Sequence, residues 1–139
     1  MYYIQVSMKN NIYKFIVYLY YLSLIVLIIL YLFPGSIIGY FFYGNSNIQP
    51  NLIKNPIGTS INHFFYFSFL SFLGFIYNLN KQKFINSFFF LFILSLLLEL
   101  LHLFIPNRAF ELNDVLANIT GVVVIYFLFF FKKLLNEKI

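Results

Sequence analysis

Residues 84–121 read FINSFFFLFILSLLLELLHLFIPNRAFELNDVLANITG, and this stretch decides the fold. Residues 84–105 are nearly all apolar, and a helix rising about 1.5 Å per residue over that length crosses the ~30 Å hydrocarbon core of a bilayer. Pro106 ends this run, and a second apolar run extends over residues 115–131. The sequence therefore predicts two antiparallel membrane helices joined by a short hairpin at residues 106–113.

Two further apolar runs precede this pair, and a tight connection at residues 80–83 leads into it. Residues 34–61 hold several Pro, Gly and Asn residues and are predicted to form a loop. Its apolar part at 37–43 is too short to cross and is expected at the membrane interface or in a re-entrant dip. We expect an all-α, polytopic membrane protein with one domain over residues 1–139, a four-transmembrane-helix bundle with spans at about 15–33, 62–79, 84–105 and 115–131.

The composition fits a membrane protein and excludes several other classes. Hydrophobic residues make up 62% of the chain and charged residues 9%, against about 25% charged in soluble domains. The net charge of +5 comes from basic residues that stand singly or in pairs, so they form no stripe for nucleic acid. Without cysteine there is no disulfide, thiol nucleophile or cysteine metal site. The 21 Phe and 12 Tyr match an AT-rich genome and say little about function.

The distribution of basic residues predicts the orientation in the membrane, because cytoplasmic loops carry an excess of Lys and Arg. With both termini and the loop at 80–83 in the cytoplasm, only Lys54 and Arg108 lie outside. Seven of the 9 basic residues then lie inside, namely Lys9, Lys14, Lys81, Lys83, Lys132, Lys133 and Lys138. We therefore expect a multi-pass protein of the bacterial inner membrane, with the loops at 34–61 and 106–114 facing outward.

One acidic residue lies inside a predicted span. A charge at the bilayer centre costs at least ~2.5 to 3.5 kcal/mol, so ionisable residues within spans usually have a function. We therefore take Glu99 as a candidate functional residue. His102 follows three residues later on the same helix face. The hairpin that follows is short enough for Arg108 to reach back toward Glu99.

The neighbouring spans add polar groups at the same outer level. Asp114 stands where the N-cap of the last helix is expected, and Asn118 lies one turn deeper. Ala117 and Gly121 have the small-x-x-x-small spacing that lets helices approach closely. With His63 at the start of the second span, three helices contribute to one candidate binding or reactive site, composed of His63, Glu99, His102, Arg108, Asp114 and Asn118. The alternative is architectural, with a Glu99–Arg108 ion pair and Asp114 as a helix cap.

Glu99 and His102 also have the Glu-x-x-His spacing of carboxylate-bridged metal bundles. Such bundles need two copies of the motif and further carboxylates from other helices. We therefore assign no metal and no other cofactor from the sequence. His63 by itself fits a hydrogen-bonded structural histidine near an interface.

The stretch from Glu99 to Gly121 resembles the signature of the VanZ-like family of small bacterial membrane proteins. That family typically shows Glu-x-x-Gln, then a Pro with an Arg shortly after, then Asp-x-x-x-Asn-x-x-Gly. The matching positions are Glu99, Pro106, Arg108, Asp114, Asn118 and Gly121. His102 stands where the family usually has Gln, and Thr59-Ser60 replace an Asp-Lys pair that members tend to carry before a His such as His63.

The resemblance implies a small bacterial membrane protein. The family is named for a member linked to teicoplanin-type glycopeptide resistance, and its molecular mechanism is not established. We expect the outward site to bind the head of a lipid or lipid-linked cell-envelope molecule, with Arg108 on its phosphate or carboxylate. One alternative is a small membrane enzyme acting on such a headgroup, with Glu99 or His102 as general base. Another is a structural or partner-binding subunit, and an oligomer is compatible with each. Transport is disfavoured because the spans show no internal repeat.

Overall fold

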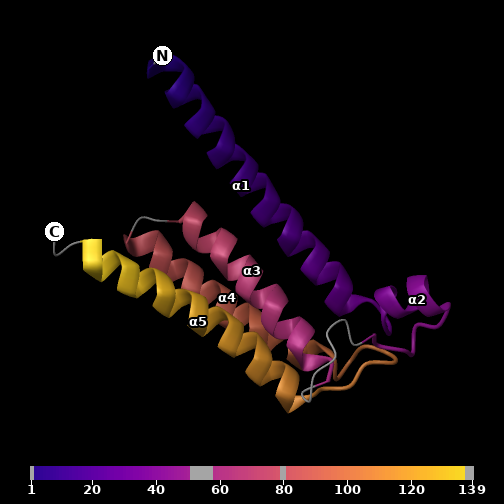
Figure 1. The fold of residues 1–139 in the computed structure, drawn as a ribbon. Helices are drawn as coiled ribbons and strands as arrows, with labels where there is room; N and C mark the ends of the chain where they lie inside the picture. The colour runs from indigo at the N-terminus through magenta and orange to yellow at the C-terminus, as the bar shows by residue number, and fades with distance from the viewer. Residues whose placement is uncertain (1, 51–57, 79–80, 137–139) are drawn as a thin grey trace.

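The computed structural model describes residues 2–50, 58–78 and 81–136, and this part of the chain contains five helices and no strand. The helices are α1 (Tyr2–Leu32), α2 (Ile37–Tyr43), α3 (Ser60–Tyr77), α4 (Lys81–Leu101) and α5 (Leu112–Asn136). The four long helices run in alternating directions (Figure 1). As a result, α2 and the α4–α5 connection lie at one end of the bundle, opposite the start of α1 and the end of α5.

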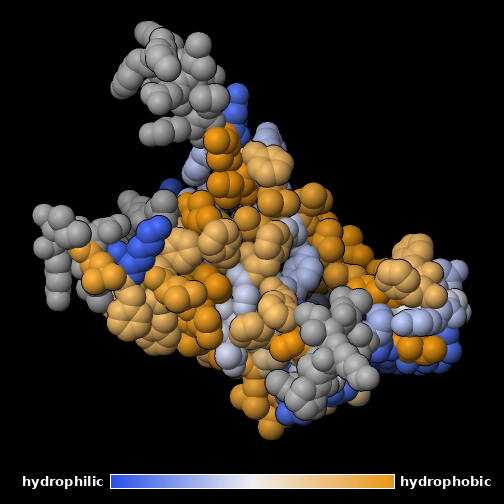
Figure 2. Space-filling model, in the orientation of Figure 1, coloured by the Kyte–Doolittle hydropathy of each residue, from blue (hydrophilic) through white to orange (hydrophobic). Residues whose placement is uncertain are grey.

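Three of the described helices contain a segment long and apolar enough to cross a membrane, namely Asn11–Leu32, Lys83–Leu101 and Leu112–Lys132. They correspond to three of the four predicted spans. The predicted span at 62–79 is α3, which falls outside this set because polar residues such as Asn62 and His63 lie in its first turn. Apolar residues cover the sides of the helices in Figure 2, and hydrophilic residues gather mainly toward the ends. The chain is thus an all-α, multi-pass membrane protein.

The boundaries of α4 and α5 differ from the predicted spans at the end of the bundle that carries α2. The helix predicted to reach residue 105 ends at Leu101, and the chain continues in tighter turns in which His102 N–H donates to Glu99 O at 3.1 Å. Helix α5 begins at Leu112, earlier than the predicted start at residue 115. Asp114 therefore lies inside the first turn of α5, and its predicted role as the N-cap is wrong.

Helix α2 forms within the predicted loop, over the apolar stretch at 37–43. Ser36 caps its start, because the Ser36 hydroxyl accepts a hydrogen bond from Gly39 N–H at 2.9 Å. Gly44 ends it in the left-handed conformation, with φ of 64°. Gly39 has no room for a side chain because the Ile48 carbonyl oxygen lies where a Cβ would stand. The returning chain thus packs on α2, and the place of this helix at the membrane interface stays a prediction.

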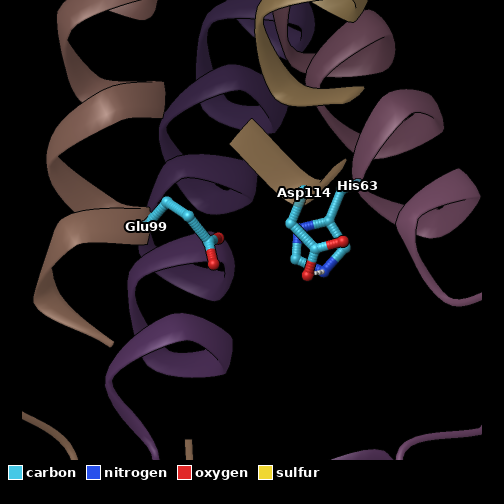
Figure 3. A group of neighbouring side chains, drawn as sticks. All are labelled: His63, Glu99 and Asp114. Carbon is cyan, nitrogen blue, oxygen red and sulfur yellow. Dashed lines mark ion pairs between the residues drawn. The ribbon is translucent and has the colours of Figure 1, made fainter. Parts of the chain in front are cut away.

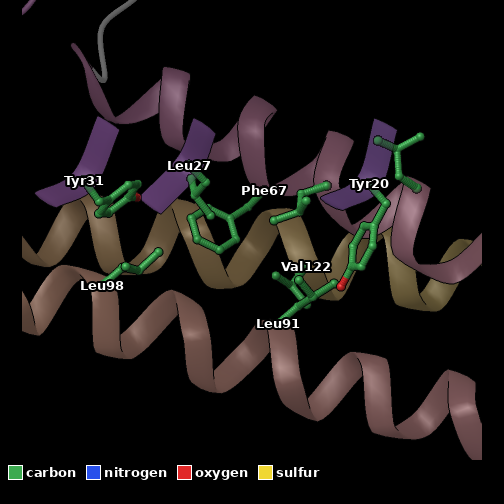
Figure 4. Packing of buried hydrophobic residues seen from close by; sticks show 9 residues of the cluster. Tyr20, Leu27, Tyr31, Phe67, Leu91, Leu98 and Val122 are labelled. Atoms are coloured by element: carbon green, nitrogen blue, oxygen red, sulfur yellow. The ribbon is translucent and has the colours of Figure 1, made fainter. Parts of the chain in front are cut away.

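Helix α3 is the centre of the bundle. It packs most extensively against α5 and also contacts α1 and α4. On α4 the buried residues Phe84, Leu91 and Leu98 are seven apart, so they return to the same face after two turns. The core between the helices, drawn in Figure 4, consists of Tyr20, Leu27, Tyr31, Phe67, Leu70, Leu73, Leu91, Leu98 and Val122.

Gly121 lets α5 approach the backbone of α3. A Cβ at this position would lie 2.7 Å from the carbonyl oxygen of Phe64 and 3.0 Å from Ser68 N. The close helix approach predicted from the small-x-x-x-small spacing is confirmed at Gly121. It holds the start of α5, with Asp114 and Asn118, against the start of α3.

Replacing Gly121 with Leu is expected to destabilise the protein by about 1 to 3 kcal/mol or more, because the added side chain meets backbone that has no space to move. The measurement is thermal unfolding of the purified protein in detergent. Thr120→Leu is the matched control. Thr120 is the exposed neighbour on the same helix, so a leucine there adds a side chain without meeting α3. Equal melting temperatures for Gly121→Leu and the wild type would contradict the close α3–α5 packing.

Candidate functional site

The polar side chains of the bundle converge at the end that carries α2 and the α4–α5 connection. The last turn of α1, the first turns of α3 and α5, and the last turn of α4 all contribute. The structure brings all six predicted residues into this region through direct contacts and shared cavities: His63, Glu99, His102, Arg108, Asp114 and Asn118. All except Arg108 are buried. Their functional role stays a prediction.

Tyr31 at the end of α1 connects three of the helices. Its hydroxyl donates a hydrogen bond to Asn118 Oδ1 at 2.9 Å and lies 2.7 Å from His63 Nδ1. Its ring also stacks on the His102 ring, with centroids 5.1 Å apart. Through Tyr31, α1 becomes the fourth helix that contributes a side chain to this region, whereas three were expected from the sequence.

Glu99 is the most deeply buried acid, with 0% of its surface exposed. Its Oε1 accepts a hydrogen bond from the backbone N–H of Glu111 at 3.3 Å and lies 3.0 Å from His102 Nδ1. Its other oxygen, Oε2, has no hydrogen-bond partner among the described residues. Because buried polar atoms are nearly always hydrogen-bonded, this oxygen is an unsatisfied acceptor.

Asp114 contacts His63 across the α3–α5 contact, with Oδ2 3.3 Å from Nε2. The Asp114 Oδ1 atom has no partner among the described residues. In Figure 3 the Glu99 carboxylate extends from α4 toward this pair. One donor atom each from His63, Glu99 and Asp114 lie within 4.8 Å of one another, so the three could hold a metal ion.

Arg108 binds α1 instead of Glu99. Its Nη2 donates to the carbonyl oxygen of Leu30 at 2.6 Å, and its Nε donates to that of Phe33 at 3.4 Å. The last carbonyls of a helix lack intrahelical partners and carry negative partial charge, which favours a cation there. The alternative that places Arg108 in an ion pair with Glu99 is therefore wrong, since no such pair forms among the described residues.

Two charged groups of the α4–α5 connection have shifted pKa values. Burial lowers the pKa of the Arg108 guanidinium, although an arginine stays protonated in proteins. Burial raises the pKa of the Glu111 carboxyl, and the nearby carboxylates of Asp114 and Glu99 raise it further. The region thus combines one retained positive charge with acids that are crowded together.

Two cavities adjoin at this end of the bundle. The first, of about 390 Å³, lies between α1, α2 and α3 and is lined largely by apolar side chains, including Leu27, Leu30, Ile37, Ile38, Phe65 and Phe69. The second, of about 270 Å³, is lined mostly by polar residues, including Asn47, Thr59, Asn107 and Glu111 of the connecting segments and Asp114 of α5. Both are lined by Ser36, Gln49, His102 and Arg108, so these side chains stand between them.

Sequence reasoning missed two contributors to the site. Tyr31 is one of 12 tyrosines, and no spacing sets it apart from those that face lipid. Its place in the last turn before Pro34, at the outer end of a predicted span, was the available signal. Glu111 contributes its backbone N–H to Glu99, and a backbone donor carries no sequence signal at all.

Comparison with known proteins assigns the family. A model of the VanZ/LLP1 family matches residues 15–134, which include every residue of the resembling motif from Glu99 to Gly121. No curated protein and no solved structure matches the chain. Because the family match covers most of the chain and three of the described helices have membrane length, this chain is a multi-pass membrane protein that belongs to the VanZ/LLP1 family.

Proposed function

We propose that this protein binds an anionic lipid or lipid-linked cell-envelope molecule, with the hydrocarbon chain in the apolar cavity and the headgroup in the polar one. The observation that carries the proposal is the pair of adjoining cavities, one apolar and one polar, with Arg108 lining both. A volume of about 390 Å³ lies within the ordinary range for small-molecule pockets, roughly 300 to 1,000 Å³. An amphiphile matches both environments at once.

Arg108 supplies the charge that selects an anionic headgroup. A guanidinium has five N–H donors, and the two bonds to Leu30 and Phe33 leave other donors of the fork available. This planar fork matches the oxygens of a phosphate or carboxylate. Because α1 holds the guanidinium in place, little side-chain entropy would be lost on binding.

The apolar cavity would favour a hydrocarbon chain through burial. The walls from α1, α2 and α3 are predominantly apolar, so an acyl chain can leave the surrounding lipid for the cavity without contacting water. Any effect on teicoplanin susceptibility would follow from binding an envelope precursor. The support for that link is family likeness alone.

We further propose four membrane spans, with α3 as the fourth and both termini in the cytoplasm of a bacterial cell. The alternating directions of α1, α3, α4 and α5 support an even number of crossings (Figure 1). The excess of basic residues at the end opposite α2 supports the orientation. In this arrangement both cavities lie on the outer side of the inner membrane.

Single cysteines can test this topology, because the natural chain has no cysteine. A membrane-impermeant maleimide added to intact cells is expected to label the Asn47→Cys and Ala109→Cys variants. The Lys83→Cys variant, whose cysteine is also at an exposed position, is expected to react only after the cells are permeabilised. If α3 does not cross, Asn47→Cys and Lys83→Cys would share one side and Ala109→Cys would lie on the other. That pattern would exclude the four-span arrangement.

Arg108→Gln is expected to weaken binding of dioctanoyl phosphatidylglycerol by roughly 10- to 150-fold. This range corresponds to the loss of one hydrogen bond to a charged group, which contributes about 1.5 to 3 kcal/mol. Calorimetric titration of the purified protein in detergent measures it, with dioctanoyl phosphatidylcholine for comparison. Lys83→Gln is the matched control because it removes one positive charge at the other end of the bundle. Equal weakening by both variants would indicate nonspecific attraction to the micelle.

Ile38→Trp is expected to fill the apolar cavity and weaken binding of the same lipid about tenfold, since fewer CH₂ groups can be buried. The matched control is Ile25→Trp, which adds the same bulk on the exposed face of α1, where Ile25 is 55% exposed. Titration of a series with lengthening acyl chains gives a second readout. If Ile38→Trp leaves the chain-length dependence unchanged, the chain does not enter this cavity.

A further inference from the structure

The His63–Asp114 contact has a hydrogen-bonding pattern that points to a positive charge between the two side chains. The Tyr31 hydroxyl donates to Asn118 Oδ1, so its oxygen is left to accept from His63 Nδ1–H. A neutral His63 then presents the lone pair of Nε2 to Asp114 Oδ2, at 3.3 Å. Two acceptors at that distance repel unless a proton or a metal cation lies between them.

Glu99 provides a second, independent observation at the same place. It is fully buried, and its Oε2 has no partner among the described residues, as is also true of Asp114 Oδ1. Figure 3 shows the Glu99 carboxylate extending toward the His63–Asp114 pair. Two carboxylates with unsatisfied oxygens in a low-dielectric interior call for compensation by positive charge.

We propose that His63, Glu99 and Asp114 form a binding site for a divalent transition-metal ion such as Zn²⁺. The charges balance, because two carboxylates and a neutral imidazole neutralise one divalent cation. The proposal concerns these three side chains alone and does not depend on lipid binding at Arg108.

The distances suit coordination by such an ion. Zinc bonds of about 2.0 to 2.2 Å at tetrahedral angles place neighbouring ligand atoms roughly 3.4 Å apart. The His63 Nε2 and Asp114 Oδ2 atoms are 3.3 Å apart, and the Glu99 donor lies within 4.8 Å of both. Rotation of the Glu99 carboxylate about its side-chain torsions can shorten the wider separation.

The ligand set favours a transition metal over magnesium or calcium. One imidazole nitrogen with carboxylate oxygens suits Zn²⁺, Mn²⁺ or Fe²⁺, whereas Mg²⁺ and Ca²⁺ prefer oxygen ligands throughout. Metal-binding histidines usually donate their other ring N–H to a partner that orients the ring. Tyr31 is such a partner for His63, because its oxygen accepts the Nδ1–H.

The site supplies part of what the sequence lacked for a metal assignment, namely a carboxylate from another helix, although no second copy of Glu-x-x-His is present. Glu-x-x-His on one helix needs further carboxylates from other helices. Asp114 of α5 is such a carboxylate, and His63 of α3 adds a nitrogen ligand. His102, in the turn directly after α4, is 3.0 Å from Glu99 Oε1 and orients that carboxylate. Three protein ligands leave a further coordination position for water or a substrate oxygen.

Calorimetric titration of the full-length protein, freed of metal with a chelator and held in detergent, tests the proposal. ZnCl₂ is expected to bind with 1:1 stoichiometry and to raise the melting temperature, and MgCl₂ at the same concentration is expected to do neither. Glu99→Gln and Asp114→Asn are expected to weaken Zn²⁺ binding by at least about 100-fold. Tyr31→Phe, which removes the hydroxyl that orients His63 and also bonds to Asn118 but leaves all three ligands in place, is expected to weaken it by roughly 10- to 100-fold.

Two controls separate this site from its surroundings. Glu111→Gln removes an acid that is not one of the three ligands and is expected to weaken Zn²⁺ binding far less than Glu99→Gln. Arg108→Gln removes a nearby positive charge and should not weaken Zn²⁺ binding, although it weakens lipid binding, so failure of one proposal is distinguishable from failure of the other. Because a ligand variant can fail to fold, the visible spectrum of Co²⁺ bound to the wild type provides a readout of nitrogen and oxygen coordination without mutation.

The absence of saturable Zn²⁺ binding to the folded wild type would overturn the proposal and leave the His63–Asp114 contact as a proton-mediated pair. Equal loss of affinity in Glu111→Gln and Glu99→Gln would also overturn it, because nonspecific attraction to acids would then explain the binding. A Co²⁺ spectrum identical to that of the aqueous ion would count against coordination by these side chains.

Discussion

Burial of the Glu99 carboxylate is the constraint on which the end of the bundle that carries α2 depends. A carboxylate inside a membrane protein is costly unless hydrogen bonds and opposite charges surround it. Glu99 obtains a hydrogen bond from the Glu111 backbone N–H, which requires the α4–α5 connection to fold back over the end of α4. The early end of α4 at Leu101 places His102 in a tight turn, 3.0 Å from the same carboxylate. The loop geometry thus follows from the acid that it covers.

Helix α1 is tied to this end of the bundle by two side chains from very different parts of the sequence. Arg108 satisfies carbonyl oxygens at the end of α1, and Tyr31 bonds to Asn118 and contacts His63. At its N-terminal end α1 diverges from α3, α4 and α5 (Figure 1). The apolar cavity lies next to the tied end, where α1, α2 and α3 form its walls. The position of α1 therefore decides whether that cavity exists.

Reasoning from the sequence succeeded where a pattern was local. The apolar runs predicted the long helices, and Gly121 predicted that its helix approaches a neighbour closely, because each depends on residues within a few turns of one another; the structure identifies that neighbour as α3. It was wrong about Asp114 as a cap and about an Arg108–Glu99 ion pair. The first error arose because α5 begins at Leu112, before the apolar run that defined the predicted span, and the second because the carbonyls at the end of α1, far away in the sequence, bind Arg108. Tyr31 was missed because its position before Pro34 is only a weak signal among 12 tyrosines.

By itself the sequence determined that the chain is a helical membrane protein and that one acid lies within an apolar run, because the length of an apolar run and the cost of a buried charge are properties of single segments. The tertiary structure alone decided which groups surround that acid. Glu99, His63 and Asp114 come from three helices, and their donor atoms meet within 4.8 Å only after those helices pack. Partner choice at a buried site depends on which atoms remain unsatisfied after packing, and that cannot be read from spacing along one chain.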